Sequence, residues 1–205
     1  MVPTVTYDKR RRYGRSRARR RRGILLLLIV LVAILAILPF ALRVPDAVMY
    51  TIYPLRHEAT IRQASEKNDL EPAFVAAVIY TESRFRPGVE SHQEAYGLMQ
   101  LLPQSASYIK RNSGIKGDYR DPRVNIKLGT WFLGYLNDRY DGDERLMLAA
   151  YNSGEGSVEA WTSDEGFDIQ KDIPYKETRE YVDKVLEAQE TYKQLYGSDL
   201  REGGS

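Results

Sequence analysis

The sequence predicts an all-α domain preceded by a single transmembrane helix. An uncharged apolar stretch near the N-terminus predicts the membrane helix. Behind it, helix starts marked by acids and prolines are followed by apolar residues at helical spacing, which predicts the all-α domain. No segment of useful length alternates between apolar and polar residues, so no strand is expected.

Composition narrows the classes of protein to which the chain can belong. Its 205 residues leave room for one globular domain of ordinary size. The absence of cysteine excludes a disulfide framework, a thiolate metal site, a cysteine nucleophile and a lipidated N-terminal cysteine. With two histidines in the chain, a zinc site would need several carboxylates to complete it. We expect neither a metal ion nor an organic cofactor.

The apolar stretch covers residues 24–42, reads ILLLLIVLVAILAILPFAL and contains no charge. As a helix it would be about 28 Å long, close to the thickness of the bilayer core. A buried core helix rarely reaches this length without a polar position. A secretory signal usually has a shorter apolar core and a cleavage site of small residues, which residues 42–46 do not offer. An uncleaved anchor over residues 23–43 is therefore predicted.

Charge predicts the orientation of this anchor. Residues 1–22 hold ten Lys and Arg against one acid, whereas the rest of the chain holds 20 bases and 27 acids. A basic run directly before a span stays in the cytoplasm and contacts anionic lipid headgroups. A nucleic-acid patch is the alternative, but the position of the run and the acidic outer domain disfavour it. Residues 1–22 are thus predicted to be a basic cytoplasmic segment.

Proline and glycine indicate the limits of the outer domain. Pro45 and Pro54 lie in residues 44–56, which we interpret as a juxtamembrane linker. Residues 57–196 have a helical pattern and form the predicted domain. The glycine-rich residues 197–205 are predicted to form a flexible tail.

Three helices of this domain begin at a proline. Asp69–Pro72 opens the first, whose apolar face runs to Glu82, and Pro103 opens a short one through Ile109. Asp121–Pro122 opens the third, with Asp121 as the expected cap. Behind it an apolar stripe at helical spacing predicts core residues: Leu128, Trp131, Phe132, Tyr135 and Leu136.

Two further helices are expected towards the C-terminus. A short one spans Glu144 to Tyr151 and ends in the turn Asn152-Ser153-Gly154. A longer one spans Lys176 to Tyr196, with Val182 and Val185 on one side.

Glu82 is the first candidate for chemistry. The preceding residues AFVAAVIYT are apolar, so its carboxylate emerges where a core helix meets a loop. Burial disfavours the charged form of a carboxyl and raises its pKa, as a general acid near neutral pH requires. Local context alone is more typical of a solvated surface glutamate than of a catalytic one.

Four blocks in series resemble the soluble lytic transglycosylase family, whose catalytic domains share the goose-type lysozyme fold. They are TESRFRP at 81–87, AYGLMQLLP at 95–103, AAYNSG at 149–154 and IPYKETREYV at 173–182. The likeness covers roughly residues 57 to 192 at family-like spacing. It implies a lysozyme-like domain that acts on peptidoglycan glycan strands at a bacterial plasma membrane.

The resemblance also implies roles for individual residues. Glu82 matches the catalytic acid/base, and Ser91 and Gln100 match residues that line the adjoining sugar subsite. Tyr151 and Asn152 match the tyrosine block near the acid and the sugar, and Glu177 matches a position linked with the peptide stem. In one departure, Glu94 stands where many relatives have glycine.

The implied reaction needs a single carboxyl, because the muramyl C6 hydroxyl attacks and a 1,6-anhydro end forms. Two alternatives remain open. One is a hydrolytic lysozyme in which Asp118, Asp121 or Glu94 guides water. The other is a membrane-tethered wall-binding module without catalytic activity.

Overall fold

The computed structural model describes Leu25, residues 27–33 and residues 46–201, in two compact units that divide at Pro45. In the first unit, Leu25 and residues 27–33 are helical and exposed. The predicted basic segment 1–22 lies outside the described residues, as does most of the predicted anchor. No helix in the described residues has the length and hydropathy needed to cross a bilayer.

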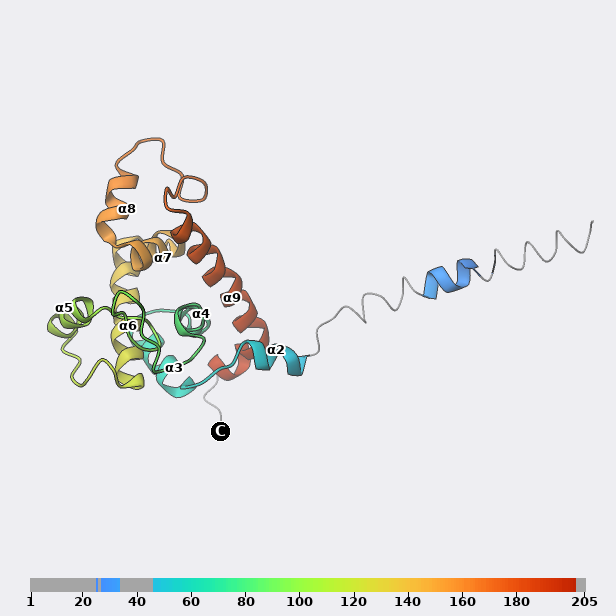
Figure 1. The fold of residues 1–205 in the computed structure, drawn as a ribbon, viewed down its shortest axis with the longest axis horizontal. Coiled ribbons are helices and arrows are strands. Elements are labelled where there is room, and N and C mark those ends of the chain that lie inside the picture. The colour runs from blue at the N-terminus through green and yellow to red at the C-terminus, as the bar shows by residue number, and fades with distance from the viewer. Residues whose placement is uncertain (1–24, 26, 34–45, 202–205) are drawn as a thin grey trace, which may run out of the picture. The chain divides into compact units, whose positions relative to one another are not determined.

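The second unit is helical (Figure 1). Two isolated β-bridges, Glu90 with Tyr96 and Tyr96 with Leu101, are the only extended pairing in the described residues. The prediction of an all-α domain is therefore confirmed. The helices, in chain order, are α2 (Asp46–Ile52), α3 (Glu58–Lys67), α4 (Pro72–Ser83), α5 (Pro103–Ser113), α6 (Pro122–Arg139), α7 (Glu144–Ser153), α8 (Glu155–Thr162) and α9 (Lys176–Arg201).

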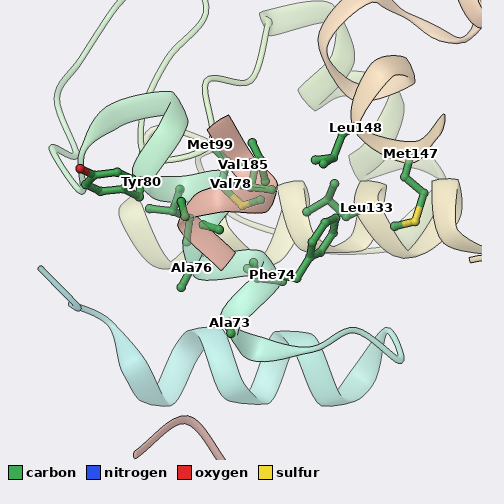
Figure 2. Packing of buried hydrophobic residues seen from close by; sticks show 14 of the residues in the cluster. Ala73, Phe74, Ala76, Val78, Tyr80, Met99, Leu133, Met147, Leu148 and Val185 are labelled. Carbon is green, nitrogen blue, oxygen red and sulfur yellow. The ribbon is translucent and has the colours of Figure 1, made fainter. Parts of the chain in front are cut away.

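Helix α4 forms the centre of the core. Every residue from Ala73 to Tyr80 is buried, because this helix is apolar on all sides. It packs against α3 and α9, and Figure 2 shows its side chains among Met99, Leu133 and Leu148. A helix buried in this way fixes the position of whatever residue follows its last apolar turn, and here that residue is Glu82.

The first turns of the helices contain the prolines and the capping acid that the sequence predicts. Proline occupies the first turn of α4, α5 and α6. The Asp121 carboxylate accepts hydrogen bonds from Arg123 N and Val124 N, so it is the cap of α6. Asp143 caps α7 in the same way.

The predicted stripe on α6 is only partly core. Leu128 and Leu136 are fully buried, whereas Trp131, Phe132 and Tyr135 are half-buried. The Tyr135 ring stacks with those of Trp131 and Phe132, at centroid distances of 6.1 and 6.0 Å. These large rings pack against the edge of the core and leave part of their surface exposed.

Both ends of the domain differ from the prediction. The predicted linker 44–56 contains α2, which packs against α9, and the predicted tail 197–205 continues α9 as far as Arg201. The reason is aromatic packing, because Tyr196 is buried and its ring meets that of Tyr50 edge-on at 5.2 Å. Helix α8 was not predicted either.

Candidate functional site

Glu82 lies in the last turn of α4, where the chain reverses. The reversal uses two successive left-handed residues, Arg84 at φ 54° and Phe85 at φ 58°. Phe85 is buried, and its packing holds this conformation in place. The Glu82 side chain is partly buried, and its Oε1 accepts a hydrogen bond of 2.7 Å from the Tyr181 hydroxyl on α9.

The surroundings of Glu82 favour the protonated carboxyl. Burial raises its pKa from 4.5 to about 7, although the hydrogen bond from Tyr181 acts in the opposite direction. Burial, together with the nearby Glu82 charge, raises the pKa of the Tyr151 and Tyr181 hydroxyls well above 10. Both tyrosines therefore stay neutral, while Glu82 exchanges a proton near neutral pH.

This pKa shift predicts a stability difference between the wild type and the variant Glu82→Gln. The folded state binds the Glu82 proton more tightly than the unfolded state, so wild-type stability falls as pH rises from 4.5 to about 7. The glutamine of the variant does not titrate, so between about pH 4 and pH 8 the variant should gain roughly 3 kcal/mol of stability relative to the wild type. Urea unfolding of both proteins across this range measures the difference, and parallel stability curves would contradict the pKa assignment.

The loop that contains residues 97–100 is tied to α4 and α6. Ser83 Oγ lies 2.9 Å from Leu98 O and 3.0 Å from Ile79 O, which joins the end of α4 to the loop. From α6, the buried Asn125 accepts from Met99 N at 2.8 Å through Oδ1. Its Nδ2 donates to Tyr96 O at 3.0 Å and Tyr119 O at 2.9 Å.

Gly97 allows this close approach. It has φ +85°, and an added Cβ would lie 2.6 Å from Asn125 Nδ2. A side chain there would meet both a backbone penalty and a collision. The glycine of the GLMQ block thus lets Asn125 reach the loop backbone.

Tyr151 connects α7 to the same loop. Its hydroxyl donates to Met99 O at 2.7 Å, and its ring lies 5.8 Å from that of Phe132. Two parts of the predicted site, the tyrosine block and the GLMQ block, are thereby held together. Tyr151 also lies within electrostatic range of Glu82.

Ser91 and Gln100 both hold the loop in shape. Ser91 Oγ accepts from Gln93 N at 3.2 Å and Ala95 N at 3.1 Å. Gln100 Nε2 donates to Val89 O at 3.0 Å and to the carbonyl of Gly97 at 2.9 Å. The contacts of both residues are thus within their own loop, and neither residue lines one of the cavities described below.

Two cavities share Asn152. The first, the α9 cavity, has a volume of about 410 Å³ and is lined by residues that include Thr81, Arg84, Asn152, Glu177, Tyr181 and Lys184. The second, the α5 cavity, has a volume of about 490 Å³ and is lined by residues that include Gln104, Tyr108, Phe132, Tyr151, Asn152 and Glu155. The two tyrosines that are electrostatically coupled to Glu82 therefore lie one in each cavity. Glu82 is not itself a lining residue of either cavity; Tyr181 connects it to the first, and Tyr151 to the second.

Asn152 and Glu177 meet the α9 cavity from two helices. Asn152 Oδ1 accepts from Thr178 Oγ1 at 2.9 Å, which joins the end of α7 to the start of α9. This contact orients the Asn152 amide, because the oxygen already has its donor. Glu177 is exposed in the first turn of α9.

Three important residues were missed by the sequence reasoning. Tyr181 is the hydrogen-bond partner of Glu82, Asn125 holds the loop, and Thr178 orients Asn152. Tyr181 lies in the fourth block, four residues after Glu177, and this spacing on one helix face could have indicated it. Nothing near Asn125 in the sequence points to the loop it contacts.

The three carboxylates that could guide water in the hydrolytic alternative lie outside the two cavities. Asp118 Oδ1 accepts from Arg120 N, and Asp121 caps α6. Glu94 is exposed with φ 64°, a left-handed conformation that favours the glycine found in many relatives. None of the three lines either of the two cavities described above. No group of acids and histidines in the described residues could hold a metal ion.

Comparison with known proteins identifies the family. Residues 59–173, more than half of the chain, match the transglycosylase SLT domain. The chain belongs to this family. Its SLT domain contains Glu82, the cavity residues Tyr151 and Asn152, and the loop held by Asn125.

Curated relatives share this SLT domain. The soluble lytic murein transglycosylase of Salmonella typhimurium is 30% identical over 156 residues, which cover 71% of this chain and 24% of the relative. Membrane-bound lytic murein transglycosylase C of Cronobacter sakazakii is 33% identical over 162 residues, which cover 65% of this chain and 45% of the relative. The chain thus spans between a quarter and a half of the length of these relatives.

Solved structures share the fold of the SLT domain. A lytic transglycosylase of Pseudomonas aeruginosa, solved as an inactive mutant, matches with a TM-score of 0.66 and 31% identity, over 71% of this chain and 25% of that one. The 70-kDa soluble lytic transglycosylase of Escherichia coli matches with a TM-score of 0.69 and 28% identity, over 73% and 26%. A complex of the 70-kDa soluble lytic transglycosylase with bulgecin A matches equally well.

Proposed function

We propose that this protein is a membrane-anchored lytic transglycosylase that cleaves the β-1,4 bond between N-acetylmuramic acid and N-acetylglucosamine in peptidoglycan. One observation carries the proposal: a carboxyl whose pKa is raised to about 7 is coupled to a tyrosine in each of two cavities that share Asn152. A glycan strand needs room on both sides of the bond that is cleaved. The names of the relatives support the same activity, and the likeness to goose-type lysozymes stays a prediction.

Glu82 serves as both acid and base in this proposal. The protonated carboxyl gives its proton to the leaving glycosidic oxygen as that bond breaks. The resulting carboxylate takes the proton of the muramyl C6 hydroxyl, whose oxygen bonds to the anomeric carbon. The product is a 1,6-anhydro end, no water is consumed, and Glu82 is protonated again. A pKa near 7 suits both steps, because each protonation state is accessible.

The remaining residues bind and orient the sugar. Tyr181 holds the Glu82 carboxyl through its 2.7 Å hydrogen bond. We assign Tyr151 and Asn152, which line the cavities, to the sugar, and Glu177 to the peptide stem at the α9 cavity. Ser91 and Gln100 are also assigned to the sugar, and the resemblance to the family is what supports these two, since neither lines either of the two cavities. Fixed polar groups of this kind stabilise the charge that develops in the transition state without reorganising.

Hydrolysis by the same fold is the second candidate function. It requires a second carboxylate that activates water beside the bond. Asp118 and Asp121 accept hydrogen bonds from backbone amides in their own turns and Glu94 is exposed, whereas Glu82 is partly buried against Tyr181; this difference favours the single-carboxyl reaction. A wall-binding module without activity is also disfavoured, because it has no use for a carboxyl with a raised pKa.

Mass spectrometry of the products tests the proposal. Purified peptidoglycan is digested with the full-length protein, with Glu82→Gln as the control, and the soluble fragments are analysed. We expect anhydro-muramyl ends, lighter by one water molecule than the hydrolysed ends. Hydrolysed ends would support the lysozyme alternative, and absence of fragments from the wild type would support the binding module.

Tyr181→Phe should move the pH profile of the reaction. The Tyr181 hydrogen bond lowers the Glu82 pKa, so its removal raises that pKa further above 7. The protonated acid then persists to higher pH, and the basic limb of the kcat/KM profile should shift upward by about one unit. Initial rates of peptidoglycan cleavage between about pH 5 and 9 measure this shift. An unmoved basic limb would mean that another group controls it.

The proposal includes a location and a lipid partner, both inferred from the sequence. We propose that residues 23–43 anchor the protein in the bacterial plasma membrane, with residues 1–22 on the cytoplasmic side against anionic lipids. The catalytic domain then faces the peptidoglycan. Relatives that are named membrane-bound support an association with the membrane, although others are named soluble.

A further inference from the structure

The segment between α2 and α3 is fastened to α9 through its backbone. The Tyr192 hydroxyl donates to Pro54 O at 2.8 Å, and the Tyr196 hydroxyl donates to Tyr53 O at 2.8 Å. Two successive carbonyl groups are thereby fixed, so the direction of the Tyr53 side chain is fixed as well. This segment precedes residues 59–173, which match the SLT family.

Tyr53 forms one end of a stack in the wall of the α9 cavity. Its ring lies 4.5 Å from that of Tyr80 at an interplanar angle of 27°, and meets Tyr192 edge-on at 6.0 Å. The Arg84 guanidinium lies 4.0 Å from the centre of the Tyr80 ring. Tyr53, Tyr80 and Arg84 all line the cavity, and we call them the Tyr53 stack.

Two members of the Tyr53 stack lie close to Glu82 in the sequence. Tyr80 lies two residues before Glu82, and Arg84 lies two residues after it. Neither the Arg84 guanidinium nor the Tyr53 hydroxyl has a hydrogen-bond or ion-pair partner in the part of the chain that the structure describes. The Arg84 donors are therefore available to oxygens of a ligand in the cavity, whereas the contact of Tyr53 with Tyr80 needs only the ring.

We propose that the segment that joins α2 to α3 is a working part of the substrate site at Tyr53, and that Tyr53 is a positioning residue that holds Tyr80 and Arg84 for substrate binding. The inference rests on the proposed function, because the occupant of the cavity is the part of the peptidoglycan substrate next to the cleaved bond. It adds to the SLT domain a positioning residue that lies before the family match. Since the stack does not touch the Glu82 carboxyl, it acts on substrate affinity and not on proton transfer.

Three variants of the full-length protein test this inference. Tyr53→Leu removes the stacking ring, and Tyr53→Phe keeps the ring but removes the hydroxyl. Tyr50→Leu is the matched control, because Tyr50 also packs from α2 against α9 but does not line the cavity: its hydroxyl donates to Leu195 O at 3.1 Å. The KM and kcat for purified peptidoglycan and the thermal unfolding midpoint are measured for each.

Tyr53→Leu should raise KM about tenfold and change kcat by less than about twofold, since a stacked aromatic pair and its oriented cation contribute on this scale. Tyr53→Phe should restore most of the affinity. Tyr50→Leu should lower the unfolding midpoint as Tyr53→Leu does, yet leave KM unchanged. Equal KM values for Tyr53→Leu and Tyr50→Leu, or a failure of Tyr53→Phe to restore KM, would overturn the inference. A wild type without any cleaving activity would instead overturn the proposed function.

Discussion

Glu82→Gln should lower kcat for peptidoglycan cleavage by roughly 10²–10⁴-fold, the usual contribution of general acid–base catalysis. The introduced glutamine keeps the shape of the side chain and an oxygen that can accept from the Tyr181 hydroxyl, so the fold should be intact. It cannot give a proton to the leaving oxygen or take one from the C6 hydroxyl. Release of soluble fragments from labelled peptidoglycan measures the loss.

The control for this experiment is Glu94→Gln. Glu94 is exposed in the turn before the loop and lines neither cavity, so its neutralisation should leave kcat unchanged within about twofold. A large loss in Glu94→Gln would support the hydrolytic alternative, in which a second carboxylate guides water. Near wild-type activity in a folded Glu82→Gln would refute the assignment of the acid.

Asn125→Ala should lower the free energy of unfolding by about 3–5 kcal/mol, because three hydrogen bonds are lost at a fully buried site. The Met99 amide and the carbonyls of Tyr96 and Tyr119 would stay buried without this partner. The loop next to Glu82 should also lose its fixed position, so cleavage should fall together with stability. Urea unfolding monitored by circular dichroism measures the first effect.

Asn112→Ala is the matched control for Asn125→Ala. Asn112 is also an asparagine whose amide donates to a backbone carbonyl, here Tyr108 O at 2.8 Å, but it is exposed on α5. Its replacement should cost less than about 0.5 kcal/mol, as is usual for surface positions. A similar loss of stability in both variants would contradict the role of Asn125 in holding the loop.

Much of the fold can be predicted from the sequence because its helix signals are local. Prolines open α4, α5 and α6, and Asp121 caps α6, as the sequence predicts. A continuous apolar run identifies α4 as the core helix. The ends were predicted less well: α2 and the last turn of α9 depend on contacts between Tyr50 and Tyr196, which are far apart in the chain.

In the candidate site, too, local signals could be predicted and contacts between distant residues could not. Glu82 could be found from the sequence because a recognisable block surrounds it, although its position at the end of an apolar helix would not have been enough alone. Tyr181, Asn125 and Tyr53 could not be assigned in this way. Each acts through a hydrogen bond or ring contact to a residue at least 26 positions away.

The sequence by itself thus determined the helical class, the SLT family and the identity of the candidate acid. Only the tertiary structure decided what surrounds that acid: the Tyr181 hydroxyl, the burial that raises the Glu82 pKa to about 7, and two cavities that share Asn152. The physical reason is that helix starts and apolar patterns depend on neighbours in the chain. Burial, hydrogen bonding and the proton affinity of a carboxyl depend on neighbours in space.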